Sequence, residues 1–240
     1  MSSGLLQVIP VLDLAGGQVV RGVRGERSAY RPIRSTLAAG SDPVDIAAAL
    51  LPPAGGRQGA SIPLYVADLD AIQGGQAQLA TLRRLLALHA DLCLWLDAGL
   101  GEPAAGATLR DALGADARRL RLVYGSESLA AGGAGPGLAQ DPRAILSLDC
   151  RLERPLDPAG VWSRPALWPA TVIVMTLDRV GAAAGPDLST LPRLRALAPD
   201  RAWVGAGGIR DRGDLQAAAA TGASAWLVAS ALHDGTLRRD

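Results

Sequence analysis

Short apolar segments alternate with polar or glycine-rich connections along most of this chain. Each segment is too short to span a membrane and is typical of a buried strand. Alternating strands and helices predict a parallel sheet, because two parallel strands need a long crossover between them. The expected strands are Leu6–Leu14, Ile62–Leu69, Leu92–Asp97, Leu120–Tyr124, Ala144–Asp149, Thr171–Leu177 and two more within Ala202–Gly235.

The segments between the strands carry helix and turn signals. Ser41-Asp42-Pro43 predicts a helix that runs to about Leu51, because a capping residue precedes a proline that needs no N–H partner. Gln18–Val23 is expected to extend the first strand as a hairpin, and Arg24–Gly40 to form a polar loop. Further helices are expected at about 77–90, 108–113 and 188–198, with interruptions at the glycines of 132–137 and the prolines of 155–169.

The last two strands and their turns predict an anion site. Ala206-Gly207-Gly208 follows one strand, and Ser230 opens a helix after the next. Glycines let a backbone approach an anion closely, and the free N–H groups at a helix start favour phosphate. In parallel barrels these two loops often form a phosphate cup. The alternative is two ordinary connections built from small residues.

The length of 240 residues suits one (β/α)₈ barrel or two small domains, and the eight strand candidates favour one barrel over residues 1–240. An internal repeat supports this fold class, an α/β TIM barrel built from two half-barrels, about 1–130 and 131–240. Asp13 in LDL matches Asp149 in LDC, and VADLD matches VMTLD. The DAGL turn after the third strand resembles the AGGI turn after the seventh, so the matching elements follow the same order in both halves.

The composition excludes several function classes. The net charge of +1 argues against a general nucleic-acid or anionic-membrane binder. All 24 basic residues are arginine, so a Schiff-base or pyridoxal-phosphate mechanism has no lysine. Cys93 and Cys150 lie in apolar strands and form no metal motif with His89 or His233, so buried thiols are expected. We therefore expect a cytoplasmic protein with no metal or other cofactor.

Two aspartates are the strongest candidates for chemistry. Asp13 and Asp149 end the first and fifth expected strands, which lie opposite one another in an eight-stranded barrel. Two carboxyl groups across the catalytic mouth suit general acid–base catalysis, provided that their environments separate their pKa values. The alternative is that each aspartate only caps a turn.

The pattern IPVLDLAGGQVVRGVRG, with YVADLD, ILSLDC, VGAGGI and ASALHDG, resembles the histidine-biosynthesis barrels of the HisA and HisF type, and most closely the HisA (ProFAR isomerase) family. The resemblance covers nearly the whole chain. It implies a duplicated half-barrel, a substrate with a phosphate at each end, and an Amadori rearrangement of an aminoaldose. It also implies Asp149 as the acid that opens the ribose ring, Asp13 as the base, and Thr176 as their helper. Thr176 has an alternative role as a β-branched strand residue.

Departures from the family pattern affect the phosphate sites. DAGLG at 97–101 replaces the family's GGGIR, which puts Asp97 and Leu100 at an expected phosphate turn. The resemblance places that N-terminal site at Gly99, Gly125 and Ser126. Val180-Gly181-Ala182 replaces a DGT motif, and Ala229-Ser230 replaces a Gly-Arg pair. The better preserved site is therefore the C-terminal one, at Gly207, Gly208 and Ser230.

Several functions remain open from the sequence. The first is an isomerase, or a related acid–base enzyme, that acts on a phosphorylated sugar-derived molecule; a link to one-carbon (methanopterin-type) metabolism is implied only by related barrels. The alternatives are true ProFAR isomerase activity and a non-catalytic phosphate-binding barrel. Cyclase activity is disfavoured, because Arg21 stands where that family has an acid–base lysine. Trp162 is expected either to stack on substrate or to pack in the protein. The oligomeric state is left undetermined.

Overall fold

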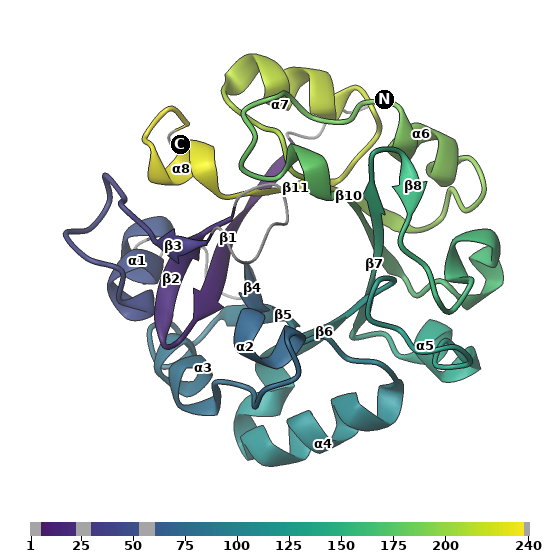
Figure 1. Ribbon diagram of the computed structural model, residues 1–240, viewed down its shortest axis with the longest axis horizontal. Helices are drawn as coiled ribbons and strands as arrows, with labels where there is room; N and C mark the ends of the chain where they lie inside the picture. Colours follow the sequence, from purple (N-terminus) through teal and green to yellow (C-terminus); the bar gives the residue numbers. More distant parts are fainter. Residues whose placement is uncertain (1–5, 23–29, 53–60, 238–240) are drawn as a thin grey trace.

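The computed structural model describes residues 6–22, 30–52 and 61–237. Eight parallel strands form a closed ring with helices around it, as Figure 1 shows. The first ring strand pairs with the last, with Gln7 opposite Ala225 and Pro10 opposite Val228. This confirms the predicted (β/α)₈ barrel. The ring strands are β1 (Gln7–Ala15), β4 (Ile62–Asp68), β5 (Leu92–Asp97), β6 (Leu120–Gly125), β7 (Ala144–Arg151), β9 (Thr171–Thr176), β10 (Ala202–Ala206) and β11 (Ala225–Val228).

The observed helices lie near the positions predicted from the sequence, but their lengths differ from the predicted ones. Asp42 accepts hydrogen bonds from the N–H groups of Val44 and Asp45, which confirms the first helix start. The helices are α1 (Pro43–Leu50), α2 (Leu69–Ile72), α3 (Leu79–Leu86), α4 (Pro103–Leu113), α5 (Pro136–Gln140), α6 (Thr190–Arg195), α7 (Arg212–Ala219) and α8 (Ser230–His233). The 3₁₀ turns of the described residues are η2 (Gly114–Arg119), η3 (Val161–Ser163), η4 (Pro165–Leu167) and η5 (Leu177–Arg179).

Three local predictions need correction. The second strand ends at Asp68, one residue early, because this side chain caps the short helix α2 by accepting from the N–H of Ala71. Helix α4 begins five residues before the expected start at 108, since Pro103 occupies its first turn. The expected polar loop contains β3 (Arg31–Pro32), which pairs with the hairpin strand β2 (Gln18–Arg21); residues 24–29 of that loop lie outside the described residues.

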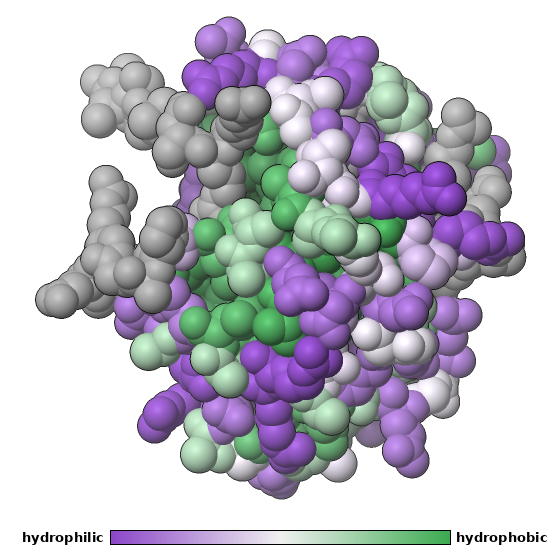
Figure 2. Space-filling view, turned by 90° about the vertical axis from the view of Figure 1, so that its left-hand side faces the viewer, coloured by the Kyte–Doolittle hydropathy of each residue, from purple (hydrophilic) through white to green (hydrophobic). Residues whose placement is uncertain are grey.

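Two short hairpins lie at the rim of the barrel. Strand β2 turns back on β1, and β8 (Arg154–Pro155) turns back on β7. Figure 2 views the molecule from the side that carries β2, β3 and α8, and hydrophobic and hydrophilic residues are mixed on this face. The described helices include none that is long and apolar enough to cross a membrane.

The strands divide the core into two layers, because successive side chains point to opposite faces. Ile9, Tyr65 and Ile173 belong to the cluster inside the barrel. The larger cluster lies between the strands and the helices and includes the buried rings of Trp168, Trp203 and Trp226. Of these, Trp168 and Trp203 meet edge to face, with ring centroids 5.6 Å apart.

Gly205 on β10 makes room for the Trp226 ring, since a Cβ at this glycine would overlap the ring atoms. We expect Gly205→Ala to lower the free energy of unfolding by about 1–3 kcal/mol. Denaturant unfolding followed by tryptophan fluorescence measures this loss. The control is Gly40→Ala, whose Cβ would have no neighbour within 4 Å. An equal loss in both variants would contradict the packing argument.

Candidate active site

A cavity of about 400 Å³ opens at the carboxyl ends of the ring strands, where enzymes of this fold place their active sites. Five of the nine residues that the sequence nominated line it: Asp13, Asp149, Gly207, Gly208 and Ser230. The other four, Thr176, Gly99, Gly125 and Ser126, are not among its lining residues. The structure therefore brings together the carboxylate pair and the C-terminal phosphate residues, but not the N-terminal phosphate residues.

Asp13 projects into the cavity from β1. Burial, with the nearby charge of Asp97, raises the pKa of Asp13 to about 7. Gly22 provides the space for this carboxyl group, because a Cβ at Gly22 would lie 2.7 Å from Asp13 Oδ2. At neutral pH this carboxyl group is therefore close to half ionised and can both take and return a proton.

Asp149 projects from β7, which lies four strands from β1 in both directions around the ring. The Ser147 hydroxyl donates to Asp149 Oδ1 over 2.6 Å, and the Glu127 N–H donates to Oδ2 over 3.2 Å. Burial raises the pKa of Asp149 to about 8, against the opposing effect of the Ser147 hydrogen bond. The charges of Glu127 and Asp97 add to the rise. Asp149 is therefore largely protonated at neutral pH and suited to act as an acid.

A third carboxylate, Asp97, stands at the end of β5 and lines the same cavity. It accepts hydrogen bonds of 3.1 Å from the Tyr65 hydroxyl and from the Gly99 N–H. The pKa of Tyr65 is raised well above its usual value by burial and by the charges of Asp97, Asp149 and Asp13. Tyr65 is thus a neutral donor among three carboxyl groups. The sequence pattern identifies Asp97 only as a residue that departs from the family at an expected phosphate turn. It does not identify Tyr65, because an aromatic residue in a strand carries no distinguishing signal.

The predicted N-terminal phosphate residues serve other contacts. The Gly99 N–H is held by Asp97, and the Ser126 N–H donates to the Ser147 carbonyl over 2.8 Å. Gly125 lies beside the acid, since a Cβ there would be 3.0 Å from Asp149 Oδ2. The donors of Gly99 and Ser126 are therefore directed at protein acceptors rather than at the cavity.

Thr176 lies on the outer side of β9, away from the carboxyl pair. Its neighbour Met175 lines the cavity, and alternation along the strand turns Thr176 toward the layer of helices. There its hydroxyl donates to Asp187 Oδ2 over 3.2 Å and receives a weak contact from the Cys150 thiol at 3.7 Å. The structure places Thr176 in contact with the loop before α6.

The opposite end of the cavity is formed by the β10 and β11 turns. Gly207 and Gly208 both have φ near +85°, at 86° and 85°, a conformation that glycine adopts at little cost. A Cβ at Gly208 would overlap the Gly185 carbonyl, so only glycine fits. Ser230 lines this end, as do Arg179 and Arg210. Arg210 is paired with Asp214 over 2.8 Å, and Arg179 lies 4.0 Å from Asp178. Two glycines, a hydroxyl and these two guanidinium groups are suited to an anionic group.

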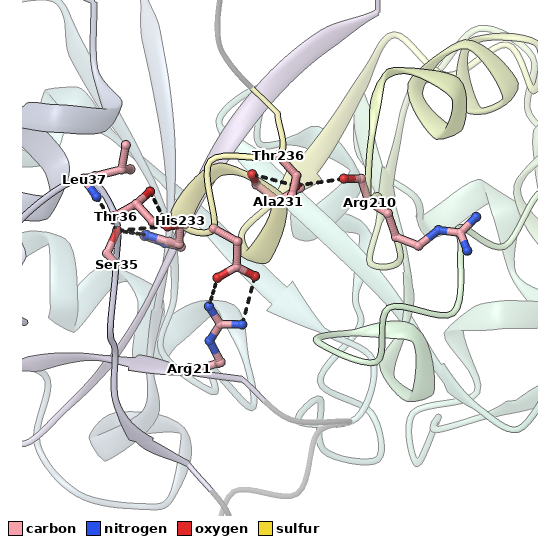
Figure 3. Close-up of polar contacts among 9 residues, drawn as sticks. Arg21, Ser35, Thr36, Leu37, Arg210, Ala231, His233 and Thr236 are labelled. Atoms are coloured by element: carbon pink, nitrogen blue, oxygen red, sulfur yellow. Dashed lines mark hydrogen bonds and ion pairs between the residues drawn. The ribbon is translucent and has the colours of Figure 1, made fainter.

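Helix α8 is fixed by contacts from three parts of the chain, drawn in Figure 3. The Thr36 hydroxyl donates to the His233 carbonyl over 3.0 Å, and the Thr236 hydroxyl reaches the Arg210 carbonyl over 2.9 Å. The guanidinium of Arg21 forms an ion pair with Asp234 through both nitrogens. Arg21 is therefore held as a cation at the position where a cyclase would need a proton donor.

The two cysteines and His233 are at least partly buried within the protein. Cys93 is half-buried and Cys150 is buried, both as free thiols. Burial lowers the pKa of His233, whose Nδ1 lies 3.3 Å from the Ser35 hydroxyl. Within the described ranges, no three His, Cys, Asp or Glu side chains are grouped so that they could hold a metal ion.

Known proteins with similar sequences match the chain from end to end. A relative from Cereibacter sphaeroides is 30% identical over 244 residues, which cover 95% of this chain and 94% of the relative. It is named an isomerase of an imidazole-4-carboxamide that carries 5-phosphoribosyl and 5-phosphoribosylamino groups. The chain belongs to this histidine-biosynthesis isomerase family. The family model for histidine biosynthesis proteins matches residues 167–238.

Two further relatives also match nearly the whole chain. A Xanthomonas campestris isomerase of the same name is 28% identical over 253 residues, covering 96% of this chain and 95% of the relative. An uncharacterised protein of Methanocaldococcus jannaschii is 24% identical over 236 residues, covering 97% and 95%. The family assignment agrees with the resemblance found in the sequence.

The raised pKa of Asp149 predicts a pH-dependent cost to stability. Because its folded pKa of about 8 exceeds its ordinary 3.8, its contribution to stability is present at low pH and lost as pH rises through about 8. Asp149→Asn should therefore raise the melting temperature, relative to wild type, by a few degrees more at about pH 8.5 than at about pH 5. Thermal unfolding at both pH values tests this. The exposed Asp111→Asn variant is the control, and a pH-independent difference in Asp149→Asn would contradict the argument.

Proposed function

We propose that this protein is an acid–base isomerase that converts a phosphorylated, sugar-derived aminoaldose into the corresponding aminoketose. One observation carries the proposal: a partly buried carboxyl group on Asp13 and a buried one on Asp149, with pKa values of about 7 and about 8, face one cavity from opposite sides of the barrel. Turn-capping residues would not need this burial. The names of the relatives support the same reaction class.

The proton transfers balance without a co-reactant. Protonated Asp149 gives its proton to the ring oxygen of the sugar, and the C1–O bond breaks as the nitrogen lone pair forms C1=N. Ionised Asp13 then removes the proton from C2, and the electron pair forms C1=C2 and neutralises the nitrogen. Asp13 returns its proton to C1 while the C2 hydroxyl gives its own proton to Asp149, which leaves a ketone at C2. Both carboxyl groups regain their starting states, so the net change is an isomerisation.

The substrate phosphate is proposed to bind at the β10–β11 end of the cavity, with Gly207, Gly208 and Ser230 as contacts. Arg179 and Arg210 line this end, although Asp178 and Asp214 partly neutralise their charges, and β10 lies opposite β5, the strand that carries Asp97. The donors of Gly99 and Ser126 at the other end are already held by protein acceptors. This arrangement favours a substrate whose second end donates hydrogen bonds, such as an amine or a polyol.

A second candidate is the isomerase reaction of the named relatives, whose substrate carries two phosphoribosyl groups. Full-length similarity favours it, with 30% identity to the Cereibacter sphaeroides enzyme over 95% of this chain. It requires the second phosphate to bind near Asp97, so this carboxylate is the main feature against it. Neither the cavity nor the named relatives support the one-carbon role, and we do not propose it.

The first test is turnover of the relatives' substrate and of singly phosphorylated N-glycosides of ribose 5-phosphate. Since Asp13 must be ionised and Asp149 protonated, kcat/KM should be greatest between about pH 7 and about pH 8 and fall on both sides. Asp13→Asn and Asp149→Asn should each lower kcat by about 10²- to 10⁴-fold. Asp111→Asn, on the exposed side of α4, should retain full activity.

Turnover that survives in both carboxyl variants would contradict the acid–base assignment. A folded protein that binds these ligands without converting any of them would indicate a non-catalytic barrel. Turnover restricted to the doubly phosphorylated compound would favour the second candidate.

Ser230 provides a test of the phosphate end that is separate from the proton transfers. We expect Ser230→Ala to raise KM by about three- to tenfold, because one hydrogen bond to a charged oxygen is lost, and to leave kcat within about twofold. Steady-state kinetics, with inorganic phosphate as a competing inhibitor, measures both effects. A fall in kcat at constant KM would place Ser230 at the reacting atoms instead.

A further inference from the structure

The hydroxyl group of Ser126 has a complete set of hydrogen bonds within the protein. It accepts from the Asp149 N–H over 2.8 Å and from Trp162 Nε1 over 3.1 Å. Its own proton has the Leu156 carbonyl as a partner at 2.8 Å, while Asp149 Oδ2 lies farther away at 3.4 Å. A hydroxyl has one proton and two lone pairs. These contacts use all three, and the side chain is fully buried.

The partners of Ser126 belong to one segment that returns to the acid. The Leu156 N–H donates to the Asp149 carbonyl over 2.8 Å, so the chain after β7 folds back on the residue it leaves. Asp157 then accepts from the N–H groups of Val161 and Trp162 over 2.8 and 2.9 Å, which fixes the start of η3. The indole of Trp162 is directed from this turn to the Ser126 hydroxyl. One serine on the β6 turn thus connects the backbone of Asp149 to η3.

We propose that Ser126 is a positioning residue for the Asp149 carboxyl group, and that Trp162 holds the β8–η3 segment to it through the same hydroxyl. The proposal rests on the proposed function only in that Asp149 is the acid. It gives Ser126 a role other than phosphate binding, because no donor or acceptor of its hydroxyl is left for a ligand. It also gives Trp162 a role within the protein rather than on the substrate.

Removal of the hydroxyl has a defined consequence. In Ser126→Ala, the buried N–H of Asp149 and the partly buried indole N–H of Trp162 both lose their acceptor. The backbone at Asp149 then has one fewer constraint beside the reacting atoms, where small displacements lower rate strongly. Trp162→Phe is the milder variant, because it keeps the ring volume and removes only the indole N–H.

The experiment combines a titration with kinetics on the full-length protein. Carbon-13 NMR follows the side-chain carboxyl groups of Asp149 and Asp13, assigned with the Asp149→Asn and Asp13→Asn variants. We expect Ser126→Ala to shift the titration midpoint of Asp149, and Trp162→Phe to shift it less. Asp13, which has no contact with Ser126 among the hydrogen bonds of the described residues, should keep its midpoint and serves as the internal control.

Kinetics separates positioning from phosphate binding. Ser126→Ala should lower kcat by about tenfold or more with KM within about twofold, and Ser126→Thr, which keeps a hydroxyl, should recover part of the loss. A raised KM with unchanged kcat, or weaker inhibition by inorganic phosphate, would overturn the proposal in favour of a phosphate ligand. An unshifted Asp149 midpoint in both variants would also overturn it. If the wild-type protein turns over no substrate, the proposed function fails, and the titration still decides the positioning role.

Discussion

The parallel pairing of β1 with β11 is the interaction on which the rest of the structure depends. It closes the sheet, so that the carboxyl ends of all eight strands surround one mouth. Closure places β1 and β7 opposite one another, and it is this placement that lets Asp13 and Asp149 line one cavity. In an open sheet with the same strand order, β1 and β7 would lie four strands apart along one surface, and Asp13 and Asp149 would not face one another. The interior cluster consists mainly of strand residues and includes Leu69 of α2.

Desolvation is the dominant influence on the two reactive carboxyl groups. Burial is the main cause of the raised pKa of each, and the charge of Asp97 adds to both. Asp149 keeps a higher pKa than Asp13 even though Ser147 and Glu127 donate hydrogen bonds that favour its ionised form. Under the proposed function, the group with the higher pKa acts as the acid and the other as the base.

The cavity is chemically asymmetric, although the sequence suggests two matching halves. At the β5–β6 end, Asp97 and Asp149 accept hydrogen bonds from the Gly99 and Glu127 N–H groups. At the β10–β11 end, Gly207 and Gly208 approach the cavity beside arginines. The duplicated half-barrel origin of the chain stays a prediction, since the structure shows four ring strands in each half and does not test their descent. The asymmetry limits where a phosphate group fits.

The sequence by itself determined the strands, the starts of several helices and the positions of the carboxylate pair, because these depend on local patterns: short apolar runs, a capping residue before proline, and an aspartate where a strand ends. It did not determine which face each residue takes. β9 is apolar on both faces, so nothing in its pattern shows that Met175 turns inward and Thr176 outward. The contacts of Ser126 with Trp162, 36 residues away, and of Tyr65 with Asp97, 32 residues away, were also decided only by the tertiary structure. Hydrogen bonds between distant residues leave no local signal in the chain, whereas burial of a strand leaves a short apolar run.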